Sequence, residues 1–502
     1  MLSHIIASLG PRVMVPILVA CTNAAADIPV TAVAVSGEQA PGLPPGVLYT
    51  RLDGAPRWAY LDAEGRVLYT FVAGYTTGWW RTGPGGEGPD LFVRILDPAP
   101  SAPGFLYSGM YSYMGDGGGL GLSASLRLGT VNEAAHAVYV GTPGNLRLAA
   151  MSGVPMDVLG GGTFESSGLG TGLMTNGSLT VFNGAAHLNA SPTTTGGLWL
   201  ASSDGTVQTL ALQAGTLSSA MFLKGIDQGG RVGFILGNRL YTAAPGDVRP
   251  AAYSGGVADA TYTGSGAWVF EDSAGTRVHA LHPNGTLKFL AIAGTQAPGM
   301  PEGVTFNAFR STNPSRSGEN ALFRATLTGP GIDPVEQMTF AAVNGQKRLL
   351  ARAGLPAPGL GPDVYFLGFS SGAVNDAGQI VMAASLTGPG VTADNDNALW
   401  YDPGDGVLRV LLREGDPLDF DGQSLVVRSF RSGTAYWSHG GTGGDTFNNA
   451  GQFVCGLTFT DGRSGVFLFQ IPEPSAAAAL SVVVGTLALG KRRPRAGRPR
   501  HG

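Results

Sequence analysis

The sequence has few charged residues and almost no cysteine, and both shortages exclude classes of protein. Charged residues make up only 13% of the 502 residues. No stripe of basic and aromatic residues follows a path suited to a phosphate backbone, so nucleic acid is excluded as a partner. The two cysteines, Cys21 and Cys455, cannot build a disulfide framework if the first belongs to a cleaved leader. The fold must therefore be stabilised by packing.

The motifs of familiar enzymes are missing as well. The sequence contains no nucleophile elbow, no His-Glu-x-x-His, no paired Cys-x-x-Cys and no phosphate loop before a helix. His279 and His282 lie three positions apart in an expected strand and would face opposite sides of a sheet. We interpret them as surface residues rather than a metal pair, and Cys455 as a small buried hydrophobic residue.

Glycine, proline and apolar residues are abundant instead. The 79 glycines and 33 prolines favour short strands joined by tight turns over long helices. A hydrophobic fraction of 43% is sufficient for a buried core, so the glycine content does not indicate a disordered chain. The composition therefore predicts an all-β protein.

The N-terminus has the features of an export signal. Arg12 precedes an apolar run over residues 13–20, and alanines occupy residues 24–26, where signal peptidase needs small side chains. We predict that residues 1–26 are a signal peptide. The alternative is a lipoprotein signal, because Leu-Val-Ala-Cys fits a lipidation box in which Cys21 receives the lipid.

The C-terminus combines three features in a fixed order. Pro472, Glu473 and Pro474 precede an apolar segment over residues 475–490, and six basic residues follow it. The apolar segment is slightly shorter than a permanent span of about 20 residues, and the arginines would stay on the cytoplasmic side.

This arrangement resembles the PEP-CTERM sorting signal. The resemblance implies a sorting domain over residues 471–502, with a single transmembrane helix at 475–490 that anchors the chain before processing. It also implies the export machinery and an exosortase-type enzyme as partners, the latter transferring the protein to the envelope, cell surface or extracellular matrix. The alternative is an ordinary C-terminal membrane anchor.

A loop motif recurs in the body of the chain. Gly-x-x-Ala-Pro-Gly occurs at Gly37–Gly42, Gly294–Gly299 and Gly354–Gly359, each time after a short apolar strand. Gly415 and Asp416 follow a similar strand. The period of about 60 residues is typical of a repeat architecture.

A second element within each unit is a small polar residue followed three positions later by glycine. An Asn or Asp side chain can cap its own turn, and glycine takes the positive φ that leads into a strand. Recurrence in register with the loops, rather than any one turn, defines eight units. The pairs are Asn375 with Gly378, Asn448 with Gly451, and more weakly Asp62 with Gly65, Asp116 with Gly119, Asp227 with Gly230, Thr263 with Gly266, and Ser315 with Gly318; Met174 stands before Gly177.

Eight units of about four short strands predict a ring. One unit cannot bury both faces of its sheet, whereas a radial arrangement leaves only short, protected edges. We predict a β-propeller over residues 27–470 with eight blades, seven being possible, and a pair of β-sandwiches as the alternative. The expected repeats lie near 37–100, 101–153, 153–215, 215–255, 255–294, 294–354, 354–415 and 415–470.

The last unit lacks a final strand, and the first strand has no unit before it. The strand from Thr31 to Ser36 stands directly before the first loop motif. We expect this N-terminal strand to complete the last blade and close the ring.

The body also resembles the tandem Asn-x-x-Gly-x-x-Phe repeat proteins of exported, choice-of-anchor bacterial families. The resemblance is firm from Gly294 to Gln470, although Val381 and Val454 stand where the motif has its aromatic residue. It implies an exported, anchored protein and assigns no activity.

Two features suggest ligands. Five aspartates in two clusters carry the hard oxygen atoms that calcium prefers, with turn chemistry as the alternative because neither cluster has the twelve-residue loop of a calcium hand; they are Asp394, Asp396, Asp416, Asp419 and Asp421. Trp79 and Trp80 could form a platform for sugar rings, with core packing as the alternative.

These observations predict an exported, non-catalytic repeat protein with no catalytic residues and no bound cofactor other than possible calcium. It would act in surface binding, extracellular polysaccharide being a possible partner, or as structural material. The alternative is a polysaccharide-acting propeller enzyme, a lyase or glycosidase, with carboxylates at the central mouth of the ring.

Overall fold

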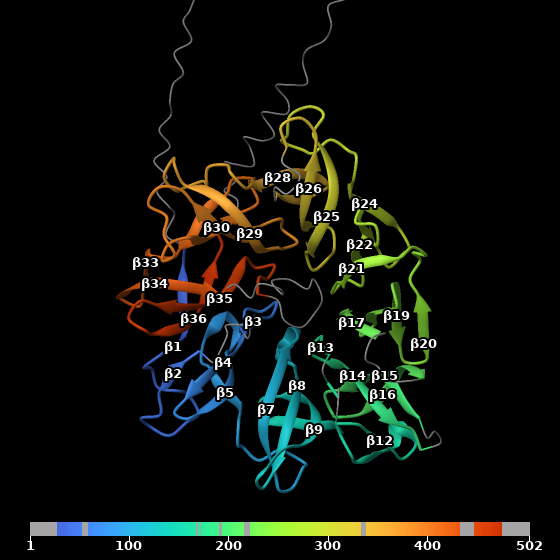
Figure 1. Ribbon diagram of the computed structural model, residues 1–502. Helices are drawn as coiled ribbons and strands as arrows, with labels where there is room; N and C mark the ends of the chain where they lie inside the picture. Colours follow the sequence, from blue (N-terminus) through green and yellow to red (C-terminus); the bar gives the residue numbers. More distant parts are fainter. Residues whose placement is uncertain are drawn as a thin grey trace, which may run out of the picture.

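The computed structural model describes residues 28–52, 59–166, 169–170, 172–189, 193–214, 221–332, 338–431 and 446–473. These residues form eight separate antiparallel sheets placed around a central axis (Figure 1). The architecture is an eight-bladed β-propeller. The predicted all-β fold and blade number are confirmed, and the alternative of two sandwiches is wrong.

Blades 1 to 4 occupy the first half of the described chain. Their strands run in order from the inner to the outer edge of each blade, and the innermost strand is interrupted in blades 1 and 3. The strands are β2 (Tyr49–Arg51), β3 (Ala59–Leu61), β4 (Val67–Ala73), β5 (Thr76–Arg81) and β6 (Asp90–Arg94) in blade 1; β7 (Phe105–Met114), β8 (Leu120–Leu128), β9 (Val131–Thr142) and β10 (Asn145–Met151) in blade 2; β11 (Pro155–Met156), β12 (Gly162–Phe164), β13 (Leu173–Thr175), β14 (Leu179–His187), β15 (Thr194–Ser202) and β16 (Val207–Ala214) in blade 3; and β17 (Met221–Ile226), β18 (Val232–Leu236), β19 (Arg239–Ala244) and β20 (Asp247–Pro250) in blade 4.

Blades 5 to 8 follow the same plan with more regular strands. The strands are β21 (Val257–Tyr262), β22 (Trp268–Asp272), β23 (Arg277–Leu281) and β24 (Leu287–Ile292) in blade 5; β25 (Thr305–Pro314), β26 (Ala321–Thr328), β27 (Met338–Val343) and β28 (Gln346–Arg352) in blade 6; β29 (Tyr365–Val374), β30 (Ile380–Thr387), β31 (Asn397–Asp402) and β32 (Arg409–Arg413) in blade 7; and β33 (Pro417–Phe420), β34 (Gln423–Arg431), β35 (Gln452–Phe459), β36 (Ser464–Gln470) and β1 (Val30–Val35) in blade 8. Each sheet from blade 1 to blade 7 lies within one of the expected repeat ranges.

Helical structure in the described part is limited to three single 3₁₀ turns, η1 (Pro84–Gly86), η2 (Asp116–Gly118) and η3 (Asp157–Leu159). Among the described residues, no helix is long and apolar enough to cross a membrane. The predicted signal peptide, Cys21, Pro474 and the helix expected at 475–490 lie outside the described residues.

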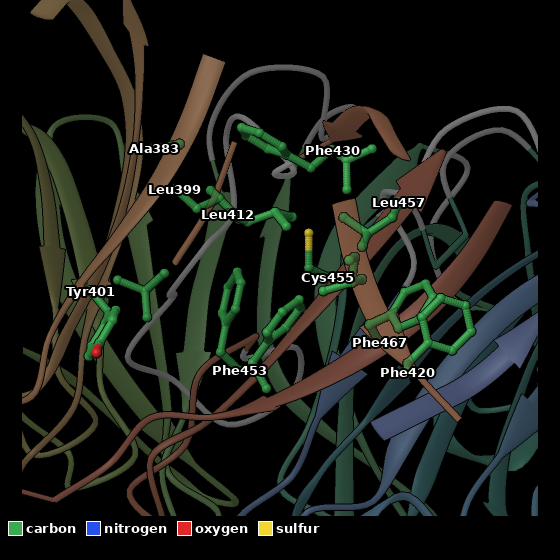
Figure 2. Close-up of a cluster of buried hydrophobic side chains, with 14 of the residues drawn as sticks. Ala383, Leu399, Tyr401, Leu412, Phe420, Phe430, Phe453, Cys455, Leu457 and Phe467 are labelled. Atoms are coloured by element: carbon green, nitrogen blue, oxygen red, sulfur yellow. The ribbon is translucent and has the colours of Figure 1, made fainter. Parts of the chain in front are cut away.

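The core is divided among the interfaces between neighbouring blades. Because side chains alternate between the two faces of a strand, each blade presents apolar residues to both neighbours. Figure 2 shows the cluster between blades 7 and 8, where Leu399 and Leu412 of blade 7 face Phe453 and Cys455 of blade 8. Burial raises the pKa of the Cys455 thiol to about 12, so this residue is an inert part of the core.

The chain leaves each blade through a loop that packs against the next blade. Gln39 of the first loop motif donates to the carbonyl oxygens of Ala40 and Pro44, and its Oε1 accepts from Gly46. The Trp80 indole donates to the Pro41 carbonyl at 3.0 Å. In blade 7, Trp400 and Pro358 make the same 3.0 Å bond. The recurring Ala-Pro-Gly segment therefore provides a carbonyl acceptor for a buried indole.

β1 lies in the last sheet although it begins the described chain. It pairs with β36 in antiparallel fashion, from Val30 opposite Phe469 to Val35 opposite Gly465. Val33, Ala34 and Val35 are buried. The Ser36 hydroxyl donates to the Ser464 carbonyl and accepts from the Ser464 amide, both at 3.0 Å. The two ends of the described chain are thus joined in one blade.

We predict that deleting residues 28–37 destabilises the whole ring. Removing two buried valines and one edge of blade 8 should cost about 4 kcal/mol or more in the free energy of unfolding, measured by chemical denaturation. The matched control begins at residue 28. A deletion variant that unfolds at the same denaturant concentration as the control would show that β1 does not hold the ring closed.

Candidate functional site

The turns between the first two strands of the blades converge at one mouth of the ring. In seven of the eight turns, all except that of blade 2, a polar side chain accepts from the backbone of its own turn. Asp62 Oδ1 accepts from the Glu64 and Arg66 amides at 2.9 Å. Asn375 and Asn448 accept from the amides four positions on, each at 3.0 Å. These are Asx turns, in which a short polar side chain replaces a backbone acceptor.

Glycine completes most of these turns because the backbone needs a positive φ three positions after the polar residue. Gly65, Gly230, Gly378 and Gly451 have φ between 74° and 83°. The pair predicted in blade 2 is displaced by one residue, since Gly115 opens the turn and Gly118 takes the positive φ. Asp116 therefore stands in the second position and Gly119 has an ordinary φ of −70°.

The turn of blade 3 also differs from the prediction. Met174 lies in β13, and the capping is done by Thr175 and Asn176. The Gly177 amide donates to Thr175 Oγ1 at 3.0 Å, and the Leu179 amide donates to Asn176 Oδ1 at 2.9 Å. This turn is one residue shorter than the others, so the polar residues that cap it do not stand three positions before the glycine, as the predicted spacing required.

Neighbouring turns are linked to one another all the way around the axis. The side-chain amides of Asn320, Asn375 and Asn448 donate to a carbonyl in the next turn, at 3.0, 3.1 and 3.0 Å, and so connect blades 6, 7, 8 and 1. Between blades 2 and 3 the backbones pack so closely that a side chain at Gly119 would overlap Gly177. The other links are Ala63 to Asp116, Asn176 to Asp227, Gln228 to Gly264 and Ser265 to Ser317. We call this closed set of eight turns the axial ring.

One ion pair crosses the axial ring. Arg316 comes from the blade 6 turn and Asp116 from the blade 2 turn, and Arg316 Nη1 lies 2.9 Å from Asp116 Oδ1. Figure 1 shows that β7 and β8 lie across the ring from β25 and β26. Only 16% of the Arg316 side chain and 26% of the Asp116 side chain are exposed. This pair therefore braces opposite blades across the centre of the propeller.

A small recess adjoins the pair at this mouth. It has a volume of about 30 Å³ and is bordered by Asp62, Arg316, Asn375, Asn448 and Asn449. A space of this size holds one or two water molecules.

The carboxylates of the mouth are engaged within the ring. Burial alone would raise the pKa of Asp376, but hydrogen bonds from Ser317 and Asn449 outweigh burial and hold the pKa below its ordinary value. Asp227 accepts from the Arg231 amide at 2.8 Å and from the Tyr262 hydroxyl at 3.0 Å. The arrangement fixes the turns and presents little free chemistry.

The two predicted calcium clusters belong to neighbouring blades, the first to blade 7 and the second to the start of blade 8. Asp394 and Asp396 belong to the loop between β30 and β31, and the chain at Gly415, beside Asp416, passes close to the Asp394 carbonyl. Asp419 lies in β33, and Asp421 is in the β33–β34 turn with a φ of 48°. In the described part, no group of three or more His, Cys, Asp or Glu residues could hold a metal ion. The calcium hypothesis therefore gains no site from the structure.

A residue that the sequence did not single out belongs to this region. Glu414 is 6% exposed, and the Asn397 side-chain amide donates to both Glu414 Oε2 and Asp396 Oδ1, at 3.0 and 2.7 Å. Burial, and then the charge of Asp396, raise the pKa of Glu414, against the hydrogen bond from Asn397. The pairing of β31 with β32 brings the start of one strand beside the end of the other and so creates this carboxyl pair.

Two other expectations are decided by burial. Trp79 and Trp80 are 2% and 0% exposed, so they pack in the core and form no sugar platform. The interpretation of His279 as a surface residue is wrong, because it is 2% exposed and stacks on Phe270 at 4.7 Å. Desolvation lowers the pKa of His279.

The described part of the predicted sorting motif lies beside the axial ring. Gln379, which closes the blade 7 turn, donates from Nε2 to the Pro472 carbonyl at 3.1 Å. The Ile471 amide donates to the Gly451 carbonyl at 2.7 Å, and Ile471 is fully buried. The chain is therefore held to the ring as far as the start of the Pro-Glu-Pro segment.

Comparison with known proteins supplies no activity for this chain. Residues 250–478 match a family model described as a family of unknown function (DUF7453). No curated protein matches the chain.

Similar solved structures are distant. Puromycin hydrolase shares 14% identity at a TM-score of 0.37, the match covering 73% of this chain and 55% of that one. An oligogalacturonate lyase in complex with manganese shares 11% at 0.37, covering 89% and 97%. The β-propeller domain of the Trilobed protease from Pyrococcus furiosus shares 10% at 0.36, covering 84% and 95%. The chain thus spans about half the length of puromycin hydrolase, and these likenesses carry nothing about its activity.

We predict measurable coupling between Arg316 and Asp116. In a double-mutant cycle with Arg316→Gln and Asp116→Asn, the coupling should be about 1–2 kcal/mol in the free energy of unfolding, because the pair is mostly buried. The matched control is the Arg463–Asp461 pair, whose side chains are 35% and 42% exposed; its coupling should stay below about 0.5 kcal/mol. Additive effects at Arg316 and Asp116 would contradict a bracing role.

We predict that Glu414→Gln stabilises the protein at neutral pH. A carboxyl with a raised folded pKa contributes most below its unfolded pKa and loses that contribution as the pH rises through the folded pKa. The substitution should raise the free energy of unfolding at pH 7 and leave it unchanged near pH 4, as measured by denaturant unfolding. Glu302→Gln, at an exposed loop residue, is the control. Equal effects of Glu414→Gln at both pH values would contradict the assignment.

Proposed function

We propose that this propeller is an exported, envelope- or matrix-associated protein that acts without catalysis, by binding at the surface or as structural material. The proposal joins the export and sorting signals expected from the sequence to the geometry of the two chain ends. The alternative, a polysaccharide-acting enzyme, serves as an outcome of the test.

The observation that carries the proposal is the position of the chain ends. β1 begins and β36 ends at the mouth that holds the axial ring, and the Gln470 amide donates to the Pro29 carbonyl at 3.0 Å. An export signal before Pro29 and a sorting signal after Ile471 would therefore extend from adjacent positions at the same mouth of the propeller. An anchor at the C-terminus would turn this mouth toward the membrane.

The opposite face would then point away from the cell. It carries the Gly-x-x-Ala-Pro-Gly loops, which are fastened by Gln39 and Gln296 through bonds to their own backbone. Rigid loops on a ring scaffold suit recognition, because binding costs little conformational entropy.

The axial ring supports a structural interpretation of its carboxylates. Catalysis at the mouth would need carboxylates free to exchange protons or to touch substrate. Asp62, Asp116, Asp227 and Asp376 instead accept hydrogen bonds from their own or neighbouring turns. Their arrangement favours stabilisation of the ring over turnover.

We predict that a host with an exosortase-type enzyme displays the full chain at its surface or in its matrix. A matched variant lacking residues 471–502 should appear in the medium instead, since it has lost the sorting signal. The released propeller should bind members of a polysaccharide panel without releasing products, and added calcium or chelator should make no difference.

Two results would contradict this proposal. Retention of the shortened variant in the envelope would remove the sorting role from residues 471–502. Product release from any polysaccharide would favour the lyase or glycosidase alternative.

A further inference from the structure

Blade 6 carries two arginines directly opposite each other. Arg310 of β25 pairs with Arg324 of β26, and Arg324 pairs in turn with Thr339 of β27. Residues paired across strands leave the same face of a sheet, and like charges in such a pair repel each other. The face turns toward blade 7, because Arg324 Nη1 donates to the Phe369 carbonyl at 3.3 Å.

No carboxylate of the described residues lies within the 4.0 Å ion-pair distance of either guanidinium. Arg324 bonds neutral oxygens instead, the Phe369 carbonyl and the Ser311 hydroxyl. Glu271 acts on Arg324 from a greater distance and is held by Thr312 at 2.8 Å. Desolvation lowers the pKa of Arg324, and the neighbouring Arg310 lowers it further against the effect of Glu271. Arg324 is partly buried and Arg310 is exposed. A partly buried guanidinium with a second cation beside it and no carboxylate at ion-pair distance points to an anionic ligand.

A recess of about 30 Å³ opens beside Arg324. It is bordered by Ser311, Asn313, Arg324, Thr339, Phe369 and Ser370. Thr339 is 7% exposed, and its hydroxyl is buried with no hydrogen-bond partner. Buried hydroxyl groups are normally hydrogen-bonded, so this one marks a place where a ligand atom would be accepted.

The backbone at Ser311, beside the recess, has an irregular conformation. The pairing of β25 with β26 shifts between Arg310 and Thr312, and Ser311 has a positive φ of 56°. In blade 7 the pairing shifts at the corresponding place, between Phe369 and Ser371. The two bulges place serines on both sides of the recess.

We propose that this recess between blades 6 and 7 binds a carboxylate group, held by Arg324 with Thr339 and Ser311. The Arg324 guanidinium supplies two N–H donors for the two carboxylate oxygens, and the Thr339 hydroxyl supplies a third hydrogen-bond donor. The site deepens the proposed binding function and rests on it, since the small recess admits one carboxylate of a larger surface ligand such as an acidic sugar.

The test measures thermal unfolding of the protein with sodium acetate, sodium glucuronate, glucose or sodium chloride at constant ionic strength. Acetate and glucuronate should raise the melting temperature, whereas glucose and chloride should not. If glucuronate raises the melting temperature at a lower concentration than acetate does, the site recognises a carboxylate carried by a sugar. If the two act at the same concentration, the site recognises the carboxylate group alone. Arg324→Gln should weaken the carboxylate response by about tenfold or more, and Thr339→Val several-fold.

Arg239→Gln, at an exposed arginine in blade 4, is the matched control and should respond like the wild type. If Arg324→Gln fails to fold, the response of Thr339→Val decides the question. An equal response to chloride and acetate, or an unchanged response in the substituted proteins, would overturn the site. An acidic polysaccharide bound equally by wild type and Arg324→Gln would overturn the carboxylate site while leaving the proposed binding function intact.

Discussion

The propeller depends on the polar turns that meet around its axis. Every turn except that of blade 2 is capped by its own side chain, and each turn is joined to the next by a hydrogen bond or by close backbone packing. Eight weak links arranged in a circle constrain one another, because no blade can move outward without breaking two of them. The Arg316–Asp116 pair adds a brace between opposite blades. A mostly buried ion pair at this position favours one arrangement of the ring, since either partner alone would be a buried, uncompensated charge.

The turns join neighbouring blades, and apolar packing between those blades stabilises the ring. Every blade is apolar on both faces, so each buries surface against two neighbours and the last blade must meet the first. β1 closes the ring at blade 8, because this strand from the start of the described chain completes the sheet formed by the end of the chain. The same pairing places both ends of the described chain at the mouth of the axial ring. A sorting signal attached there would leave the loop face free, which is the geometric basis of the proposed surface role.

The distribution of charge separates structural from binding chemistry. At the axial mouth, carboxylates have partners and little is left over for a ligand. Between blades 6 and 7, Arg310 and Arg324 lie opposite each other without a carboxylate at ion-pair distance among the described residues, beside the unpartnered Thr339 hydroxyl. Both arginines belong to blade 6, and blade 7 closes the recess with Phe369 and Ser370, so the charge and the recess meet only when the two sheets pack together.

The sequence by itself determined the architecture, because the repeated turns are local: an Asn or Asp caps its turn and a glycine reaches a positive φ whatever the rest of the chain does. The number of blades and the places of their loops followed from that periodicity. Only the tertiary structure decided which residues meet. It displaced the blade 2 turn to Gly115 and Gly118, buried Trp79, Trp80 and His279, and brought Glu414 to Asp396 and Arg316 to Asp116. Such contacts join positions up to 200 residues apart, and no local pattern carries information about a partner on another blade.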